Sequence, residues 1–315
     1  MSNIAISNIL KVCMNLKKNE SFIVVYDENK IRIANALLEK AKKLCKKADK
    51  IEIPVGKYNG QEPPNTVAKK IKGYDVAVLI TTKSLSHTNA RREASKKGVR
   101  IASMPGVTEA VLKRTMSADY IKIKKINAKI YRVLKKKSLL KVVTDKGTDV
   151  TMYANLSFNE CGIYSEKGDF GNLPAGEVGF APIEGKTNGT IVVDKTMAGI
   201  GKLKNDIRFE VKDGFAKKIN GKSESSKLRK LLIDSKNKNA YNIAEFSFGT
   251  NYKARITGIA LEDEKVYGTI HIALGDNTSY SGGTIKAPTH LDGVISKPTV
   301  FIDNKKIMNK GRLLL

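Results

Sequence analysis

The chain has 315 residues, of which 41% are hydrophobic and 6% aromatic, and this composition excludes a disordered chain. The chain has 57 Lys and Arg residues and 31 Asp and Glu residues, which gives a formal net charge of +26. The lysines occur throughout the sequence, without interleaved aromatic residues and without a motif that reads nucleic acid. We therefore expect no specific nucleic-acid partner. The three widely spaced cysteines, the lack of a signal-peptide pattern and the lack of a long apolar run predict a cytoplasmic protein with no membrane partner.

The first part of the chain alternates between helical and strand patterns. Helical periodicity predicts helices and apolar runs predict strands. The predicted helices lie at about 3–17, 29–47, 64–71, 89–97 and from Thr108, and the predicted strands at 22–26, 51–54, 76–80 and 99–102. Helices that alternate with continuous apolar strands are typical of a parallel sheet.

A candidate binding residue follows the apolar strand at 76–80. His87 stands in the segment TTKSLSHTNARREA, and ligand sites in open α/β sheets cluster where the parallel strands end. We therefore expect His87 to bind substrate; the alternative is that Ser86-His87-Thr88 only starts a helix by N-capping. No G-x-G-x-x-G follows the first strand, so no dinucleotide is expected.

The pattern changes after a basic connecting helix predicted at 117–137. Strands are predicted at 140–145, 149–154, 190–194, 207–212 and 215–219, with a hairpin turn at Asp213-Gly214 and one helix at 223–234. The sequence thus predicts an α/β N-terminal domain, residues 1–137, with a mainly parallel sheet and a connecting helix at its end. It predicts an α+β C-terminal domain, residues 138–315, with a mainly antiparallel sheet.

Two of the three histidines lie near the end of the sequence, His271 in GTIHIALG and His290 in PTHLDG. His290 and Asp292 are two residues apart, which in an extended segment points both side chains to the same face. An imidazole nitrogen and a carboxylate oxygen suit Zn²⁺, Mn²⁺, Co²⁺ or Fe²⁺. Taken alone, the same spacing also fits a hydrogen-bonded pair.

Three glutamates add to this pattern. Glu177 follows GNLPAG, and Glu245 lies among apolar residues in NIAEFSFG. Burying a carboxylate is costly unless it is paired or binds a metal, so both glutamates are candidate metal ligands. The alternative for each is an N-cap or a salt bridge. Glu264 lies seven residues before His271, so the two would share a face if the segment were helical. The alternative for Glu264 is an exposed acidic helix start.

The strings GNLPAGEV, AEF-x-x-GTN, EDEK-x-x-GTIHIALG and HLDG, taken in this order, resemble the M29 (thermophilic aminopeptidase T) family of metal-dependent aminopeptidases. The resemblance covers about residues 139–315 and extends loosely to the N-terminal part through SHTNARREA and RIASMPGVTEA. It implies two divalent metal ions, Zn, Co or Mn. Residue by residue, it places their ligands at Glu177, Glu245, His271, His290 and Asp292.

The resemblance also implies a reaction: a homodimeric aminopeptidase that uses a metal-activated water to release N-terminal residues from short peptides. Glu264 would carry the proton from the water to the leaving amine. The family's typical peptidases are longer, and their tyrosine after the HIALG segment falls at Thr278. Tyr280, two residues on, is the substrate-binding tyrosine that we expect here.

A second interpretation keeps the scaffold and changes the reaction. A branch that resembles this family comprises ring-opening dioxygenases of dihydroxypyridine, which hold one Fe²⁺ through two His and one Asp. His271, His290 and Asp292 could supply that set, with His87 as the base toward a ring hydroxyl. Retention of Glu177 and Glu245 favours the peptidase. A third interpretation, a non-enzymatic nucleic-acid binder, predicts affinity that falls steeply with salt.

Overall fold

The structure is a computed structural model that describes residues 2–315. Its contacts divide the chain into two compact units, neither of them continuous in sequence. The first unit runs to Lys124 and includes Glu160–Ala175, and the second comprises Lys125–Asn159 and Gly176–Leu315. In this division residues 125–137 go with the second unit.

The first unit is built on a five-stranded sheet in the order β2-β1-β3-β4-β7, and its neighbouring strands are parallel. Three of its strands are almost wholly buried, as expected for a parallel sheet covered on both faces. The strands are β1 (Ser21–Tyr26), β2 (Lys47–Glu52), β3 (Val76–Ile80), β4 (Arg100–Ser103) and β7 (Phe170–Asn172).

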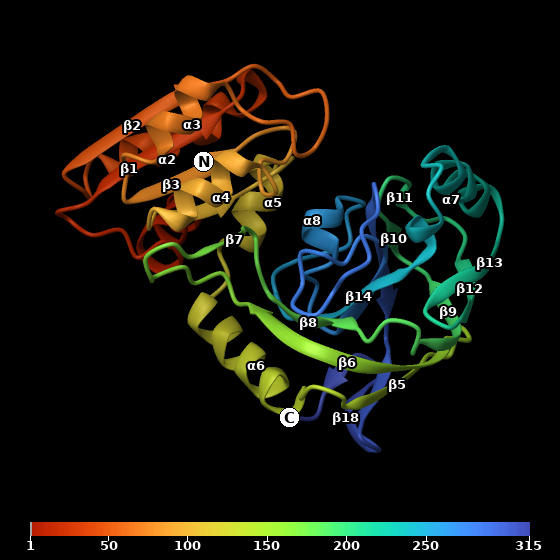
Figure 1. Cartoon of the computed structure of the whole chain (residues 1–315). Coiled ribbons are helices and arrows are strands. Elements are labelled where there is room, and N and C mark those ends of the chain that lie inside the picture. The colour runs from red at the N-terminus through yellow and green to blue at the C-terminus, as the bar shows by residue number, and fades with distance from the viewer. Residues whose placement is uncertain (1) are drawn as a thin grey trace. The chain divides into compact units, whose positions relative to one another are not determined.

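Helices lie around this sheet, as Figure 1 shows. They are α1 (Asn3–Ser7), the π-helix η1 (Asn8–Cys13), the short η2 (Glu28–Lys30), α2 (Ile31–Ala41), α3 (Asn65–Ile71), α4 (Asn89–Lys96) and α5 (Glu109–Thr115). The prediction of one helix at 29–47 was wrong at its end. Helix α2 stops at Ala41, and Lys47 begins β2 because the backbone there pairs with β1.

The second unit is a 14-stranded sheet in the order β11-β10-β16-β15-β14-β8-β6-β5-β17-β18-β19, with β9, β12 and β13 off this path. Its strands are β5 (Leu139–Val143), β6 (Asp149–Glu160), β8 (Glu177–Pro182), β9 (Asn188–Val193), β10 (Thr196–Met197), β11 (Gly201–Lys202), β12 (Ile207–Lys212), β13 (Phe215–Asn220), β14 (Ile243–Gly249), β15 (Thr269–Gly275), β16 (His290–Ser296), β17 (Thr299–Ile302), β18 (Lys305–Asn309) and β19 (Arg312–Leu313). Neighbouring strands of this sheet pair antiparallel, as β10 does with β16, β14 with both β15 and β8, β15 with β16, and β17 with β5.

Helix α7 (Ser223–Asp234) spans the residues of the predicted helix at 223–234, and α8 (Ala260–Asp263) and η3 (Lys238–Tyr241) are short. The helix predicted at 117–137 is α6 (Tyr120–Val133). The predicted fold class is confirmed: an α/β part with a parallel sheet and an α+β part with an antiparallel sheet. Within residues 2–315 no helix combines the length and the apolar character that a membrane crossing requires.

The strands β8, β14 and β15 are buried along their whole length. On one side, Phe246 packs edge-on against Phe248 with ring centroids 5.0 Å apart, and Phe180 lies 5.4 Å from Phe246. These three rings belong to the apolar core of the second unit. Because side chains alternate along a strand, the odd-numbered residues of β14 point to the opposite face, where the polar residues lie.

Candidate metal centre

All five predicted ligands stand on four adjacent strands, β8, β14, β15 and β16, within the second unit. The register places Glu245 opposite Ala273 and Ala273 opposite Asp292, so these three positions share one face of the sheet. The period of two along each strand extends this face to the other predicted ligands. They are Glu177 on β8, His271 on β15 and His290 on β16.

Several other positions of this face carry small residues. Gly179 pairs with Ser247, and Gly275 pairs with His290. A Cβ atom added at Gly179 would lie 1.8 Å from Ser247 Oγ, so no larger residue fits there. Together with Ala273, these glycines leave room above the sheet for the long polar side chains to converge.

The carboxylate of Glu245 is at the middle of the cluster and is 2% exposed. Its Oε1 lies 3.2 Å from His271 Nε2 and accepts a hydrogen bond of 2.6 Å from Ser247 Oγ. Its Oε2 lies 3.0 Å from His290 Nε2 and accepts a hydrogen bond from the Tyr280 hydroxyl. The two oxygens of the Glu245 carboxylate therefore contact two different imidazoles.

His290 is held by its other ring nitrogen. Nδ1 lies 2.7 Å from the carbonyl oxygen of Asp276, which can only accept, so Nδ1 carries the proton and Nε2 is the nitrogen that can bind an ion. Nε2 points to Glu245 and lies 3.3 Å from Asp292 Oδ1. Burial alone would lower the pKa of His290, but the carboxylates of Asp292 and Glu245 outweigh it and raise that pKa well above its usual value.

Glu177 and Glu264 share a buried lysine that the sequence analysis did not single out. Lys265 is 1% exposed, and its Nζ lies 2.5 Å from Glu177 Oε1 and 3.0 Å from Glu264 Oε1. Glu177 Oε2 also lies 3.4 Å from His271 Nε2. The signal was present in the EDEK string, in which Lys265 directly follows three acidic residues and precedes a buried strand.

Residues 264–271 do not form one helix, so Glu264 and His271 do not share a helical face. Helix α8 ends at Asp263 and His271 lies on a strand, yet Glu264 still comes close to His271 and Asp292 through the tertiary fold. Burial raises the pKa of the Glu264 carboxyl to about 7, with Asp292 adding to the effect and Lys265 opposing it. The role of Glu264 in proton transfer stays a prediction.

Three overlapping sets of side chains could hold a metal ion, each with its ligand atoms within 4.8 Å of one another. No set found in residues 2–315 contains both His271 and His290. Carboxylate oxygens with one imidazole nitrogen are donors that Fe²⁺, Mn²⁺ and Zn²⁺ accept, so this chemistry fits a divalent ion. The sets are Glu177, Glu245 and His271; Glu245, His290 and Asp292; and Glu264, His271 and Asp292.

Two aromatic rings stand beside the set that includes His290. Phe158 of β6 stacks on Tyr280 with ring centroids 4.9 Å apart and planes at 22°, and Tyr280 lies 5.8 Å from the His290 ring. Burial raises the pKa of Tyr280 well above its usual value, and the charge of Glu245 adds to this, so the phenol keeps its proton. Phe158 was missed from the sequence because nothing near it in the chain marks it.

His87 belongs to the first unit, where it is exposed and directly precedes Thr88. Thr88 is the N-cap of α4, and its Oγ1 accepts a hydrogen bond of 3.2 Å from Arg91 N, so the segment does start a helix by N-capping. Whether His87 also binds substrate stays a prediction.

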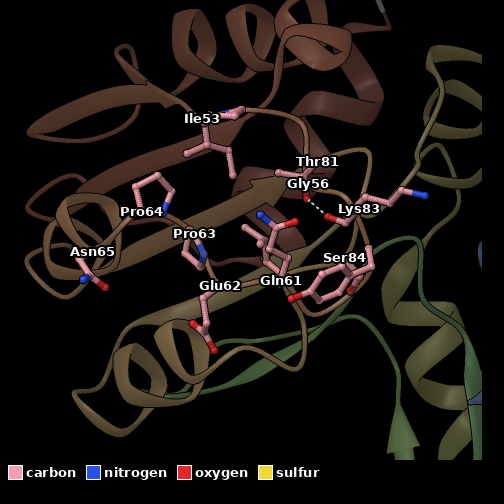
Figure 2. Close-up of a pocket in the computed structure, with 13 residues that line it drawn as sticks. Ile53, Gly56, Gln61, Glu62, Pro63, Pro64, Asn65, Thr81, Lys83 and Ser84 are labelled. Carbon is pink, nitrogen blue, oxygen red and sulfur yellow. Dashed lines mark hydrogen bonds between the residues drawn. The ribbon is translucent and has the colours of Figure 1, made fainter. Parts of the chain in front are cut away.

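The same unit has a cavity of about 350 Å³ at the carboxyl ends of β2 and β3 (Figure 2). Its lining includes Ile53, Gln61, Pro63, Thr81 and Ser84. His87 is not among the residues that line it.

Fold and site together define a class of protein: an α/β unit and an antiparallel β unit, the latter with carboxylates and imidazoles grouped for a divalent ion. The family model for 2,5-dihydroxypyridine 5,6-dioxygenase matches residues 5–315. The chain belongs to this family.

Known proteins agree with this placement. The 2,5-dihydroxypyridine 5,6-dioxygenase of Pseudomonas putida strain KT2440 is 24% identical over 318 residues, which cover 89% of this chain and 86% of that protein. The solved structure of 2,5-dihydroxypyridine dioxygenase from Pseudomonas putida KT2440 has a TM-score of 0.86 at 22% identity, covering 100% of this chain and 98% of that chain. Wild-type AmpT from Thermus thermophilus has a TM-score of 0.70 at 16% identity, covering 99% and 98%. At these identities the two structural matches show a shared fold.

The family match overturns the main sequence interpretation. The resemblance to the M29 family predicts an aminopeptidase, a hydrolase and protease that acts on short peptides, and this prediction is wrong: the family of this chain and its relative are named as dioxygenases. The error has a physical reason: the motifs that carried the resemblance place donors for a divalent ion on a shared fold, and donors alone do not choose between hydrolysis and oxygen chemistry.

Proposed function

We propose that the chain is a metal-dependent dioxygenase that opens the ring of a dihydroxypyridine. The observation that carries the proposal is the match of residues 5–315 to a family of such enzymes, together with a set of metal donors beside stacked aromatic rings. The relative from Pseudomonas putida supplies the substrate class by its name. The alternative interpretation of the sequence is thus the one that we carry forward.

The ion would be held by Glu245, His290 and Asp292. Of the three candidate sets, this one has two partly exposed members, with 28% of the His290 side chain and 15% of the Asp292 side chain exposed, so a substrate can reach it. This assignment revises the set His271, His290 and Asp292, because the two histidines contact different oxygens of Glu245. When bound, ferrous iron would supply the redox chemistry that lets dioxygen react with an aromatic ring.

The protein's own residues would bind and orient the ring. Phe158 and Tyr280 offer a flat, largely apolar surface, which suits a planar heteroaromatic substrate. His271 and Ser247 both contact Oε1 of Glu245 and would fix the direction of its carboxylate. Glu264, which comes close to His271 and Asp292, would carry a proton near the ion, and this role stays a prediction.

The proposal is tested by measuring oxygen uptake. Protein loaded anaerobically with Fe²⁺ and then mixed with 2,5-dihydroxypyridine and air should consume oxygen in step with loss of the substrate's ultraviolet absorbance. A chelator should abolish the uptake, and added Fe²⁺ should restore it.

The variant Asp292→Asn should lose the activity together with iron. The matched control is Glu210→Gln, a partly exposed carboxylate of β12 that pairs with Lys218, and this variant should behave as the wild type. An iron-loaded wild type that takes up no oxygen with any dihydroxypyridine isomer would rule out the reaction.

A further inference from the structure

One loop supplies two of the contacts that orient the candidate ligands. Residues 276–289 connect β15 to β16. From this loop the Tyr280 hydroxyl donates a hydrogen bond to Glu245 Oε2, and the Asp276 carbonyl oxygen accepts one from His290 Nδ1. The position of the loop therefore decides how Glu245 and His290 face the ion.

The tip of this loop is closed on itself. Asn277 N donates to Ile285 O at 3.1 Å, and Asn277 Oδ1 accepts from Ile285 N at 2.8 Å. Gly283 N donates to Tyr280 O at 3.0 Å, and a Cβ atom at Gly283 would lie 2.1 Å from Asn277 O. Residues 277–285 thus form a tight turn that carries Tyr280 as one body.

A carboxylate from another part of the unit holds this turn at both ends. Glu184, just beyond β8, accepts hydrogen bonds at Oε1 from Asn277 Nδ2 at 3.0 Å, from Thr284 N at 2.8 Å and from Ile285 N at 3.2 Å. Its Oε2 accepts a fourth from Thr284 Oγ1 at 2.8 Å. Partial burial raises the pKa of Glu184, but these four donors outweigh it and lower the pKa below its usual value, so the group is charged near neutral pH.

We propose that Glu184 is a positioning residue of the metal centre. It touches no candidate ligand; it holds residues 277–285 so that Tyr280 and Asp276 keep Glu245 and His290 aimed at the ion. The base of the loop has its own anchor, because Asp276 Oδ2 accepts a hydrogen bond of 2.9 Å from Ala287 N. Removing the Glu184 anchor should therefore free the tip and leave the strands in place. The inference rests on the proposed metal site.

The test uses the whole chain and Co²⁺ alone, whose visible absorption reports binding. Because partners that orient a ligand typically contribute 10–100-fold in metal affinity, Glu184→Ala should weaken Co²⁺ binding by about tenfold. Glu184→Gln should recover most of this loss. Its amide oxygen can accept from Asn277 and Thr284 N, and its NH₂ group can donate to Thr284 Oγ1.

The matched control is Glu224→Ala. Glu224 is likewise a carboxylate that anchors a loop of the second unit, accepting from Lys204 N at 3.2 Å, Asn205 Nδ2 at 3.3 Å and Ser223 Oγ at 3.0 Å. This variant should lose thermal stability and keep the Co²⁺ affinity of the wild type. Hydrogen exchange of residues 276–289 should quicken in Glu184→Ala and stay unchanged in Glu224→Ala.

The outcomes separate the two proposals. Equal Co²⁺ affinity in Glu184→Ala and Glu224→Ala, with equal losses of stability, would show that Glu184 is only structural and would overturn the inference. A wild type that binds no Co²⁺ would overturn the inference and the metal site together. If Glu184→Ala binds Co²⁺ more weakly than the wild type, but the iron-loaded wild type consumes no oxygen, the inference is supported and only the proposed reaction is ruled out.

Discussion

The Nδ1 atom of His290 lies 2.7 Å from the carbonyl oxygen of Asp276, and this contact sets which nitrogen of the ring faces the carboxylates. Because Nδ1 donates to this carbonyl, Nε2 is the ring nitrogen that faces Glu245 and Asp292. The carboxylates raise the pKa of the ring, so Nε2 donates a hydrogen bond to Glu245; loss of that proton would leave the Nε2 lone pair for an ion without any change at Nδ1. The orientation of His290 therefore depends on a backbone group, whose position is held in turn by the Asp276 side chain through its hydrogen bond from Ala287 N.

Replacing His290 should remove metal binding more completely than replacing either of the other histidines. In His290→Ala the proposed ion loses its only imidazole donor, and the affinity for Fe²⁺ or Co²⁺ should fall by roughly 100-fold or more. His271→Ala should cost less because His271 acts on the ion through Glu245 Oε1. Calorimetric titration measures both, with His87→Ala as the control that keeps metal affinity. Equal losses at His271 and His290 would contradict the assignment.

Removing the Tyr280 hydroxyl should weaken metal binding without removing the aromatic surface. Tyr280→Phe keeps a ring that can stack on Phe158 but loses the hydrogen bond to Glu245 Oε2. We expect about tenfold weaker metal affinity, and at saturating metal a substrate KM close to that of the wild type. Phe158→Leu should show the reverse pattern, with unchanged metal affinity and a raised KM. A Tyr280→Phe variant with wild-type metal affinity would show that the phenol does not orient Glu245.

A methyl group at position 179 should damage both the fold and the site. In Gly179→Ala the new Cβ would meet Ser247 Oγ at 1.8 Å and Phe246 O at 2.5 Å, so β8 must move away from β14. Overpacking of this kind costs about 1–3 kcal/mol in the free energy of unfolding. Because Glu177 and Glu245 stand on these two strands, metal affinity should fall as well. Gly73→Ala, whose nearest contact would be an ordinary 3.5 Å, should change neither the melting temperature nor the metal titration.

The stability of the first unit should depend on pH through Glu20. Its carboxylate accepts two hydrogen bonds, of 2.9 and 2.6 Å, from the buried guanidinium of Arg100. Burial would raise the pKa of Glu20, but the bonds from Arg100 and Lys17 N outweigh it and lower that pKa. A lowered folded-state pKa means that the stabilisation is complete above the unfolded pKa of about 4.3 and is lost as pH falls through the folded value.

Glu20→Gln leaves Arg100 buried without its charge partner and should cost roughly 3 kcal/mol at neutral pH. This difference from the wild type should shrink as the pH is lowered below about 4, because the wild type then loses the same charge. Unfolding monitored by calorimetry at pH 7 and pH 3 measures it. Glu93→Gln, which breaks an exposed pair with Lys72, should have little effect at either pH. If the stability difference between Glu20→Gln and the wild type is the same at pH 7 and pH 3, the charge of Glu20 does not cause the pH dependence.

Much of the fold could be predicted from the sequence because its signals are local. The apolar runs at 22–26 and 76–80 became β1 and β3, and the Asp213-Gly214 turn lies between β12 and β13, with φ of 51° and 77°. The helix at 29–47 was predicted too long because pairing with β1 is a tertiary effect that local periodicity does not contain.

The sequence predicted most of the residues that form the candidate site, but not which of their side chains contact one another. His290 and Asp292 follow from a spacing of two, whereas the contacts of Lys265 and Phe158 depend on which strands become neighbours. The two oxygens of Glu245 contact different imidazoles because of the register in which β14, β15 and β16 pair. The sequence motifs could not decide which reaction the chain catalyses, because the same metal-binding residues are used in hydrolysis and in oxygen chemistry.

Ala273 stands between Glu245 and Asp292 on the neighbouring strands, with only a methyl group directed to that face. Its small side chain leaves space between the two carboxylates on that face. A bulkier residue at position 273 would occupy the space in which an ion held by Glu245 and Asp292 would lie, and we expect it to weaken metal binding although it removes no ligand.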